Sequence, residues 1–263
     1  MDVVNHTLGD FEIGDDAMSE QGDKAAVLGH PSYVWRFGQQ RRLALMDQYV
    51  SLHQKRILDV GCGIGTYVEK LGQFSDQVYG VDIDQQRVRE GGKKLPNLLA
   101  AAAQALPFGS GCFDVLLLHE VLEHVQDDRQ VVQEAYRVLR PGGRMIIFAP
   151  NRLYPFETHG IYWRGRYRFG NFPLVNYLPR RLRERLCPHV RAYTPMDLRR
   201  LLPKLDHRII VLKQIYPGYD NIFSRRPWLG AALRRLTYLL ESTPLRIFGL
   251  SHFLVLERGQ ETR

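Results

Sequence analysis

Apolar and polar positions alternate in blocks through the middle of the chain. Apolar runs of about four to eight residues, rich in Val, Ile and Leu, predict buried strands. Between them, apolar residues recur every three to four positions and predict helices. The predicted strands are 55–60, 77–83, 97–103, 112–119 and 142–150, and the predicted helices are 32–52, 65–74, 84–95 and 127–140. Strands that alternate with helices favour right-handed crossovers and a parallel sheet.

This rhythm breaks after Pro150. Residues 151–190 are rich in aromatic residues, arginine and proline, which is typical of an insertion or lid, and 216–247 form a second insertion. The remaining predicted elements are a helix at 194–202 and strands at 207–215 and 251–258. The pattern therefore predicts a doubly wound, mostly parallel seven-stranded α/β sheet with two insertions in its C-terminal half.

One domain is predicted at 31–258, with its core at 53–150. Residues 1–30 show no sustained periodicity and are expected to form a flexible acidic segment, and 259–263 to form a tail. No apolar run reaches the roughly 18 residues of a transmembrane helix, and the acidic start does not resemble a secretory signal. The three cysteines lie far apart and suit a reducing compartment. We therefore expect a cytoplasmic protein.

The formal charge of +8 is distributed unevenly. Residues 1–30 hold seven acidic residues against one lysine, whereas 151–258 hold twenty Lys and Arg against seven Asp and Glu, a net charge of about +13. Such a surface would attract nucleic acid, a phosphate-bearing substrate or acidic lipid headgroups. A solvated basic face without a partner is the alternative.

A glycine-rich loop follows the first predicted strand. Its glycines are Gly61, Gly63 and Gly65, and they let the backbone turn sharply and approach a ligand at a helix N-terminus. A dinucleotide-binding loop would need glycine where this chain has Thr66, which disfavours an oxidoreductase. Asp59 precedes the loop, and a carboxylate there favours a sulfonium cation with an ammonium group over two phosphates.

Asp82 ends the second predicted strand. A carboxylate at that point can accept hydrogen bonds from both hydroxyls of a ribose. The alternative is an aspartate that only caps its own loop. Together with the glycine loop, Asp82 predicts a nucleoside-containing ligand at the carboxyl edge of the sheet.

Four ordered motifs carry a resemblance to a known family. They read ILDVGCGIGTYVEKL, VYGVDID, ALPFGSGCFDVLLLHEVLEHV and VLRPGGRMIIFAPN. In this order they resemble the class I S-adenosylmethionine-dependent methyltransferases, and most of all the ubiquinone- and menaquinone-pathway branch. The resemblance implies a Rossmann-like fold and S-adenosyl-L-methionine as the cofactor.

The resemblance also implies cofactor-binding roles for particular side chains. Arg36 and Arg42 compete with Arg41 for a contact with the cofactor's carboxylate. Ala102 stands where relatives carry an aspartate that bonds the adenine, so that hydrogen bond is lost or moves to Gln104. The implied set is Arg41, Asp59, Gly61, Gly63, Gly65, Asp82, Ile83, Ala103, Gln104 and His119.

Methyl transfer to an O–H acceptor needs a base, and the chain offers several. His119, Glu120, Glu123, His124 and His159 are candidates, of which we take His124 and His159 as the catalytic pair. The alternative for each is a structural side chain.

A metal-binding interpretation also exists. Glu120, Glu123 and His124 form an ExxEH sequence that resembles Mg²⁺ ligands of small-RNA 2′-O-methyltransferases and of some ubiquinone-pathway enzymes, with His189 as a further ligand. The same sequence occurs in relatives that need no metal, and we expect no metal ion in the site.

The acceptor should be decided by the two insertions, because loops on a fixed scaffold carry specificity. Residues 162–169 interleave arginine with aromatic residues, which suits RNA, a sugar or a membrane interface. We favour O-methylation of a small, glycan or lipid-linked acceptor. The alternatives are an RNA 2′-O-methyltransferase with an ExxEH metal site and a non-catalytic cofactor-binding or scaffold protein.

A basic amphipathic helix is expected at 228–240. Its apolar residues, among them Trp228 and Leu236, share one face, and Arg234 and Arg235 lie outside that face. Such a helix either packs on the core or lies on an anionic bilayer, so a peripheral membrane contact remains an alternative.

Overall fold

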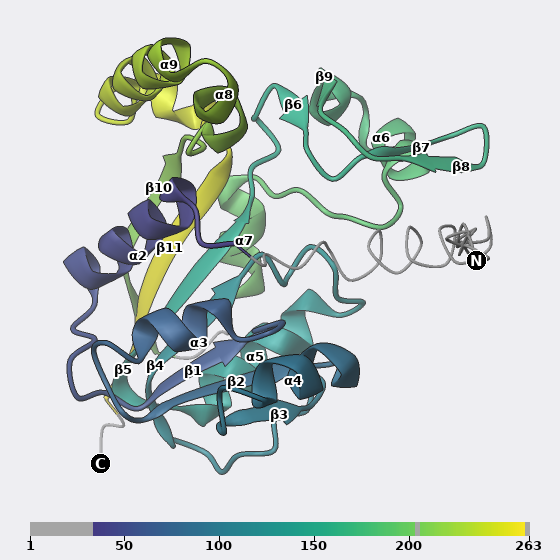
Figure 1. Ribbon diagram of the computed structural model, residues 1–263. Helices are drawn as coiled ribbons and strands as arrows, with labels where there is room; N and C mark the ends of the chain where they lie inside the picture. Colours follow the sequence, from purple (N-terminus) through teal and green to yellow (C-terminus); the bar gives the residue numbers. More distant parts are fainter. Residues whose placement is uncertain (1–33, 203–205, 261–263) are drawn as a thin grey trace, which may run out of the picture.

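The computed structural model describes residues 34–202 and 206–260. Its main feature is a seven-stranded sheet in the order β10-β11-β5-β4-β1-β2-β3, with helices on both faces (Figure 1). The expected flexible segment 1–30 and residues 261–263 of the expected tail lie outside the described residues. The doubly wound, mostly parallel fold is therefore confirmed.

The core elements follow the predicted blocks closely. Both weakly and strongly apolar runs form strands. The least apolar run forms β3, the shortest strand of the seven-stranded sheet. The core strands are β1 (Ile57–Val60), β2 (Val78–Asp82), β3 (Leu98–Ala100), β4 (Phe113–His119), β5 (Leu139–Pro150), β10 (His207–Ile215) and β11 (Ser251–Arg258). The core helices are α2 (Phe37–Tyr49), α3 (Thr66–Leu71), α4 (Gln85–Gly92), α5 (Asp128–Val138) and α7 (Pro195–Leu201).

Strand register brings the candidate residues to one edge. Ile57 of β1 pairs in parallel with Val78 of β2 and with Val115 of β4. The three strands therefore end side by side, at Val60, Asp82 and His119. Only β11 runs against its neighbours, antiparallel to both β5 and β10. The order of the strands reverses at β1, where ligands of open α/β sheets bind.

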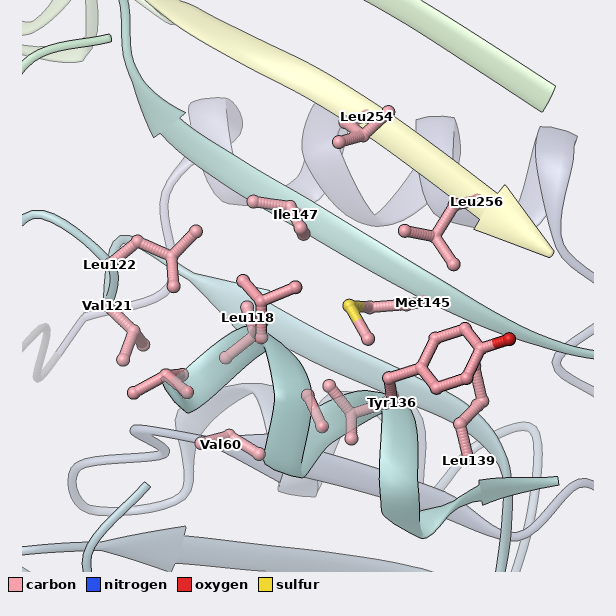
Figure 2. Packing of buried hydrophobic residues seen from close by; sticks show 14 of the residues in the cluster. Val60, Leu118, Val121, Leu122, Tyr136, Leu139, Met145, Ile147, Leu254 and Leu256 are labelled. Carbon is pink, nitrogen blue, oxygen red and sulfur yellow. The ribbon is translucent and has the colours of Figure 1, made fainter. Parts of the chain in front are cut away.

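Two hydrophobic cores hold the sheet between its helices. On one face, Leu118, Met145 and Ile147 lie on adjacent strands against α5, as Figure 2 shows. On the other face, Leu43 and Met46 of α2 join residues of α3 against the sheet. Burying both faces keeps the strand ends in fixed register, so the loops that follow them are held rigidly.

Both insertions lie beyond the end of the sheet where β5 ends and β11 begins (Figure 1). The first has a small core of its own around Ile161, Val175 and Cys187. It contains β6 (Phe156–Glu157), β7 (Ile161–Trp163), β8 (Arg166–Arg168), β9 (Phe172–Pro173), η1 (Val175–Tyr177) and α6 (Arg180–Leu186). The second contains α8 (Asp220–Arg225), α9 (Pro227–Leu240) and η2 (Pro244–Phe248). None of the described helices is long and apolar enough to cross a membrane.

Candidate active site

The glycine loop turns back tightly after β1. The backbone N–H groups of Gly61 and Cys62 both donate to the Val81 carbonyl, at 2.7 and 2.9 Å. Gly61 has a φ of 77°, and a Cβ there would lie 2.4 Å from a methyl of Val121. Gly63 has a φ of 58°, and a Cβ there would meet no neighbouring atom within 4 Å among the described residues, so this turn faces open space. The loop therefore leaves room for a ligand beside its backbone.

Asp82 ties this loop to the end of β2. One carboxylate oxygen accepts from the Gly63 N–H and the other from the Asp84 N–H, both at 2.8 Å. Asp84 in turn caps α4 through its side chain. Each carboxylate oxygen retains a further lone pair, so Asp82 can hold the loop and still accept from a ligand.

Asp59 is buried directly behind the loop. One of its oxygens has no hydrogen-bond partner among the described residues. Burial, and then the charge of Asp82, raise the pKa of Asp59 well above its usual value. A nearby cation would relieve both effects, so the site fits a ligand with an ammonium or sulfonium group.

A cavity of about 400 Å³ opens beside these residues. Ile83 projects into it with 61% of its surface exposed, which suits packing against a flat apolar ring. Of the predicted cofactor residues, the cavity wall includes Gly61, Asp82, Ile83, Ala103 and Gln104. Gln104, unlike Ala102, lines the wall, so it is the side chain available for an adenine contact. The open glycine loop, the exposed Ile83 and the unpartnered Asp59 together fit S-adenosylmethionine.

The structure places Arg41 away from this cavity. Its guanidinium pairs with Glu241 and donates to the Tyr216 carbonyl. The neighbouring Arg42 reaches the end of β4 instead, where it donates to His119 Nε2 at 2.6 Å and to Glu120 at 3.0 Å. Neither arginine lines the cofactor cavity. The contact of Arg41 with the cofactor's carboxylate therefore stays a prediction, and Arg42 is the arginine that reaches the end of β4. The two differ by one helical position, and the contacts of Arg41 with the second insertion separate them.

His119 lies at the end of β4 between aromatic rings. The ring of Tyr67 is 4.5 Å away between centroids, and Phe148 lies on another side. Burial, and then the charge of Arg42, lower the pKa of His119 to about 3. The ring is therefore neutral at pH 7 and accepts the Arg42 hydrogen bond at Nε2, which leaves the proton on Nδ1.

The Glu120–His124 segment forms a turn rather than a helix. Glu120 has a φ of 57°, and the His124 N–H donates to the Val121 carbonyl. Glu123 is buried, and neither of its carboxylate oxygens has a hydrogen-bond partner among the described residues. Burial, and then the charge of Glu120, raise the pKa of Glu123. An unpartnered buried carboxyl of this kind marks a place where a cation or a donor group can bind.

His159 of the first insertion meets this turn. Its ring centroid is 5.6 Å from that of His124. Ligand atoms of Glu123, His124 and His159 all lie within 4.8 Å of one another, which is close enough to share a metal ion. His189 does not join them: it packs on Tyr162 and Tyr167 and donates to the His159 carbonyl. Of the residues in the metal interpretation, Glu123 and His124 therefore group with His159, and neither Glu120 nor His189 belongs to this group.

Sequence reasoning did not identify the side chains that hold His159. The buried carboxylate of Glu157 accepts from both the backbone and Nδ1 of His159 and pairs with buried Arg183. The signal in the sequence is weak, since Glu157 and His159 are merely two positions apart and Arg183 is one of many arginines.

The sequence of this chain is similar to those of known methyltransferases. Residues 58–147 match a methyltransferase domain family. The ubiquinone biosynthesis O-methyltransferase of Caulobacter sp. (strain K31) is 36% identical over 104 residues, 37% of this chain and 41% of the relative. A probable S-adenosylmethionine-dependent methyltransferase of Mycolicibacterium smegmatis is 32% identical over 99 residues, 37% of this chain and 38% of the relative. The chain thus spans less than half the length of these two curated relatives.

Solved structures share the fold. An S-adenosylmethionine-dependent methyltransferase from Mesorhizobium loti aligns with a TM-score of 0.57 at 19% identity, over 82% of this chain and 96% of its own. The [4+2]-cyclase SpnF also aligns with a TM-score of 0.57, at 16% identity, over 92% of this chain and 97% of its own. The fold alone therefore does not fix the reaction, and the argument for function rests on the site.

Proposed function

We propose that the chain is a class I S-adenosylmethionine-dependent methyltransferase that methylates an oxygen atom of a small, glycan or lipid-linked acceptor. The match of residues 58–147 to a methyltransferase domain family supports this proposal. One observation carries the proposal. A single cavity is lined both by Gly61 and Asp82, which suit the cofactor, and by His124, which suits proton transfer. Cofactor and acceptor can therefore meet in one cavity.

The bound cofactor supplies an electrophilic methyl group on a sulfonium. The side chains of this protein would position it and manage the acceptor's proton. Asp59 and Asp82 would hold the charged and ribose parts. Burial, and then His159, lower the pKa of His124 to about 4, so its ring is neutral at pH 7. Its Nδ1 has no hydrogen-bond partner among the described residues and could accept a hydrogen bond from the acceptor's hydroxyl. An acceptor carboxylate would need no such base.

A screen with methyl-labelled S-adenosylmethionine against phenols, carboxylic acids, glycans and polyprenyl-linked substrates tests this function. We expect transfer to an oxygen acceptor and its loss in His124→Gln. The control is His53→Gln, an exposed residue remote from the cavity. Cofactor binding by calorimetry without transfer to any acceptor would favour the non-catalytic alternative. Failure to bind the cofactor at all would overturn the proposal.

A second candidate function is metal-assisted 2′-O-methylation of RNA. The observation that favours it is the group of Glu123, His124 and His159, in which the Glu123 carboxylate has no partner among the described residues. One carboxylate with two imidazoles fits Mn²⁺ or Zn²⁺ better than Mg²⁺, which prefers oxygen ligands. A metal there would lower the pKa of a bound hydroxyl and replace the base.

Metal binding can be measured apart from activity. Titration of the protein with Mn²⁺, followed by its electron paramagnetic resonance signal, should show one site that Glu123→Gln weakens at least about tenfold. Glu134→Gln, on α5 and outside the group, is the control. An unchanged Mn²⁺ signal in all variants would dismiss the metal, as would full turnover in EDTA.

We also propose a peripheral contact of this protein with an anionic membrane. The helix expected at 228–240 is present as α9, and its apolar face is open to solvent: Trp228 is 72% and Leu236 58% exposed. The acids of this insertion, Asp220 and Glu241, are paired with Arg234 and Arg41. These two acids therefore do not neutralise the exposed arginines beside the apolar face, and the positive charge of those arginines complements acidic headgroups.

Flotation with phosphatidylglycerol vesicles tests this contact. The double variant Trp228→Ala, Leu236→Ala should remain in solution while its affinity for single-stranded RNA stays within about twofold of the wild type. The matched control is Leu99→Ala on β3, another exposed apolar residue. Equal flotation of the double variant and the wild type would contradict the proposal.

A further inference from the structure

A second large cavity lies between the first insertion and α7. Its volume is about 910 Å³, and it shares no lining residue with the cofactor cavity. Its walls come from the loop after β5, from α6, from the segment leading to α7 and from α7 itself. This space is large enough for a metabolite-sized ligand.

Arginines dominate the charged groups of this cavity. The lining includes Arg152, Arg180, Arg183, Arg191 and Arg200, against the acidic residues Asp128, Glu184 and Asp197. Three of the arginines have carboxylate partners: Arg180 pairs with Glu184, Arg183 with Glu157 and Arg191 with Asp128. The remaining acid is also occupied, because the Asp197 carboxylate accepts from the backbone and hydroxyl of Thr194 to cap α7.

Arg152 and Arg200 form no ion pair among the described residues, whereas the other three arginines do. The carboxylate of Asp197 acts on both of them electrostatically without pairing with either. Arg152 is half-buried and oriented by a hydrogen bond from Nη2 to the Leu178 carbonyl. Burial, followed by the charges of Arg183 and Arg180, lowers its pKa. A polyvalent anion in the cavity would offset this crowding of positive charge.

We propose that this cavity binds a phosphate group, as a phosphomonoester or diphosphate, through Arg152 and Arg200. The planar guanidinium fork matches the geometry of phosphate oxygens and can bind two of them at once. The site gives a specific location to part of the positive charge of the C-terminal half. It is separate from the cofactor cavity, because the two share no lining residue.

Calorimetry with inorganic pyrophosphate on the full chain at low salt tests the site. Arg152→Gln and Arg200→Gln should each weaken binding about tenfold or more, since each removes a charge-assisted contact. Arg225→Gln, an exposed arginine of α8 outside the cavity, should change it less than about twofold. Arg200 is exposed, so its variant should fold even if Arg152→Gln does not.

No binding by the wild type at millimolar pyrophosphate would overturn the proposal, as would equal weakening by Arg225→Gln. The source of the phosphate can be separated in the same material. Pyrophosphate that competes with the methyl acceptor indicates that the acceptor carries the phosphate. Pyrophosphate that binds without inhibiting transfer indicates a separate phosphorylated ligand. Cofactor affinity, measured alongside, should stay unchanged in both variants.

Discussion

Glu157 accepts two hydrogen bonds from His159, one from the backbone N–H and one from ring Nδ1, both at 3.0 Å. Its other oxygen accepts from Arg183 at 2.6 Å. Burial raises the pKa of Glu157. The hydrogen bond and charge of His159 and the charge of Arg183 outweigh burial and lower this pKa to about 2. The carboxylate therefore stays ionised and fixes the His159 ring, with Nε2 left for the site.

Removing the Glu157 carboxylate should destabilise the protein strongly. Glu157→Ala leaves the buried Arg183 charge unpaired, and we expect a loss of about 3–5 kcal/mol in the free energy of unfolding. The double variant Glu157→Leu, Arg183→Met removes both charges and should recover most of that loss. Urea unfolding measures both. A single variant as stable as the wild type would show that the pair contributes nothing.

Asp82→Ala should weaken S-adenosylmethionine binding by roughly 2–3 kcal/mol, because it removes a charged acceptor and frees the Gly63 N–H. Calorimetry measures this, with the exposed Asp76→Ala as control. Equal affinity in the wild type and Asp82→Ala would remove this residue from the site.

Arg42 and Arg41 should behave differently on substitution. Arg42→Gln is expected to weaken cofactor binding about tenfold, because its guanidinium lies beside His119 at the end of β4. Arg41→Gln should leave that affinity within about twofold, because Arg41 pairs with Glu241 instead. The reverse order of the two effects would support the expectation drawn from the sequence.

His252 should make stability depend on pH. It is buried, donates from Nε2 to the Tyr193 carbonyl and accepts at Nδ1 from Gln214. Burial lowers its pKa from 6.5 to about 4. Between the unfolded and folded pKa values, His252 is protonated in the unfolded chain and neutral in the folded chain. The free energy of unfolding therefore falls as the pH drops from the higher pKa to the lower one.

The expected slope from His252 is at most about 1.4 kcal/mol per pH unit. His252→Gln should flatten the urea-unfolding free energy between about pH 6.5 and 4, relative to the wild type. His53→Gln, at an exposed position, serves as the control. Parallel profiles for the wild type and His252→Gln would rule out this residue as the source.

Most of the fold was predictable because the pattern that specifies each core strand or helix lies within a short stretch of sequence. The strand ends at Val60 and Asp82 and the glycine loop between β1 and α3 follow from apolar runs and glycine spacing within about 30 residues. The sheet then places these residues together, because neighbouring parallel strands end at one edge. For this reason the cofactor residues of the core could be proposed from the sequence.

Contacts between side chains of remote segments were not predictable in this way. The sequence alone determined the doubly wound core and the chemistry at its carboxyl edge, through the periodicity of the backbone. Only the tertiary structure decided that Arg42 rather than Arg41 meets His119, that His159 rather than His189 meets His124, and that the apolar face of α9 is exposed. The physical reason is that these contacts depend on how the insertions pack on the sheet, and that packing joins residues far apart in the chain.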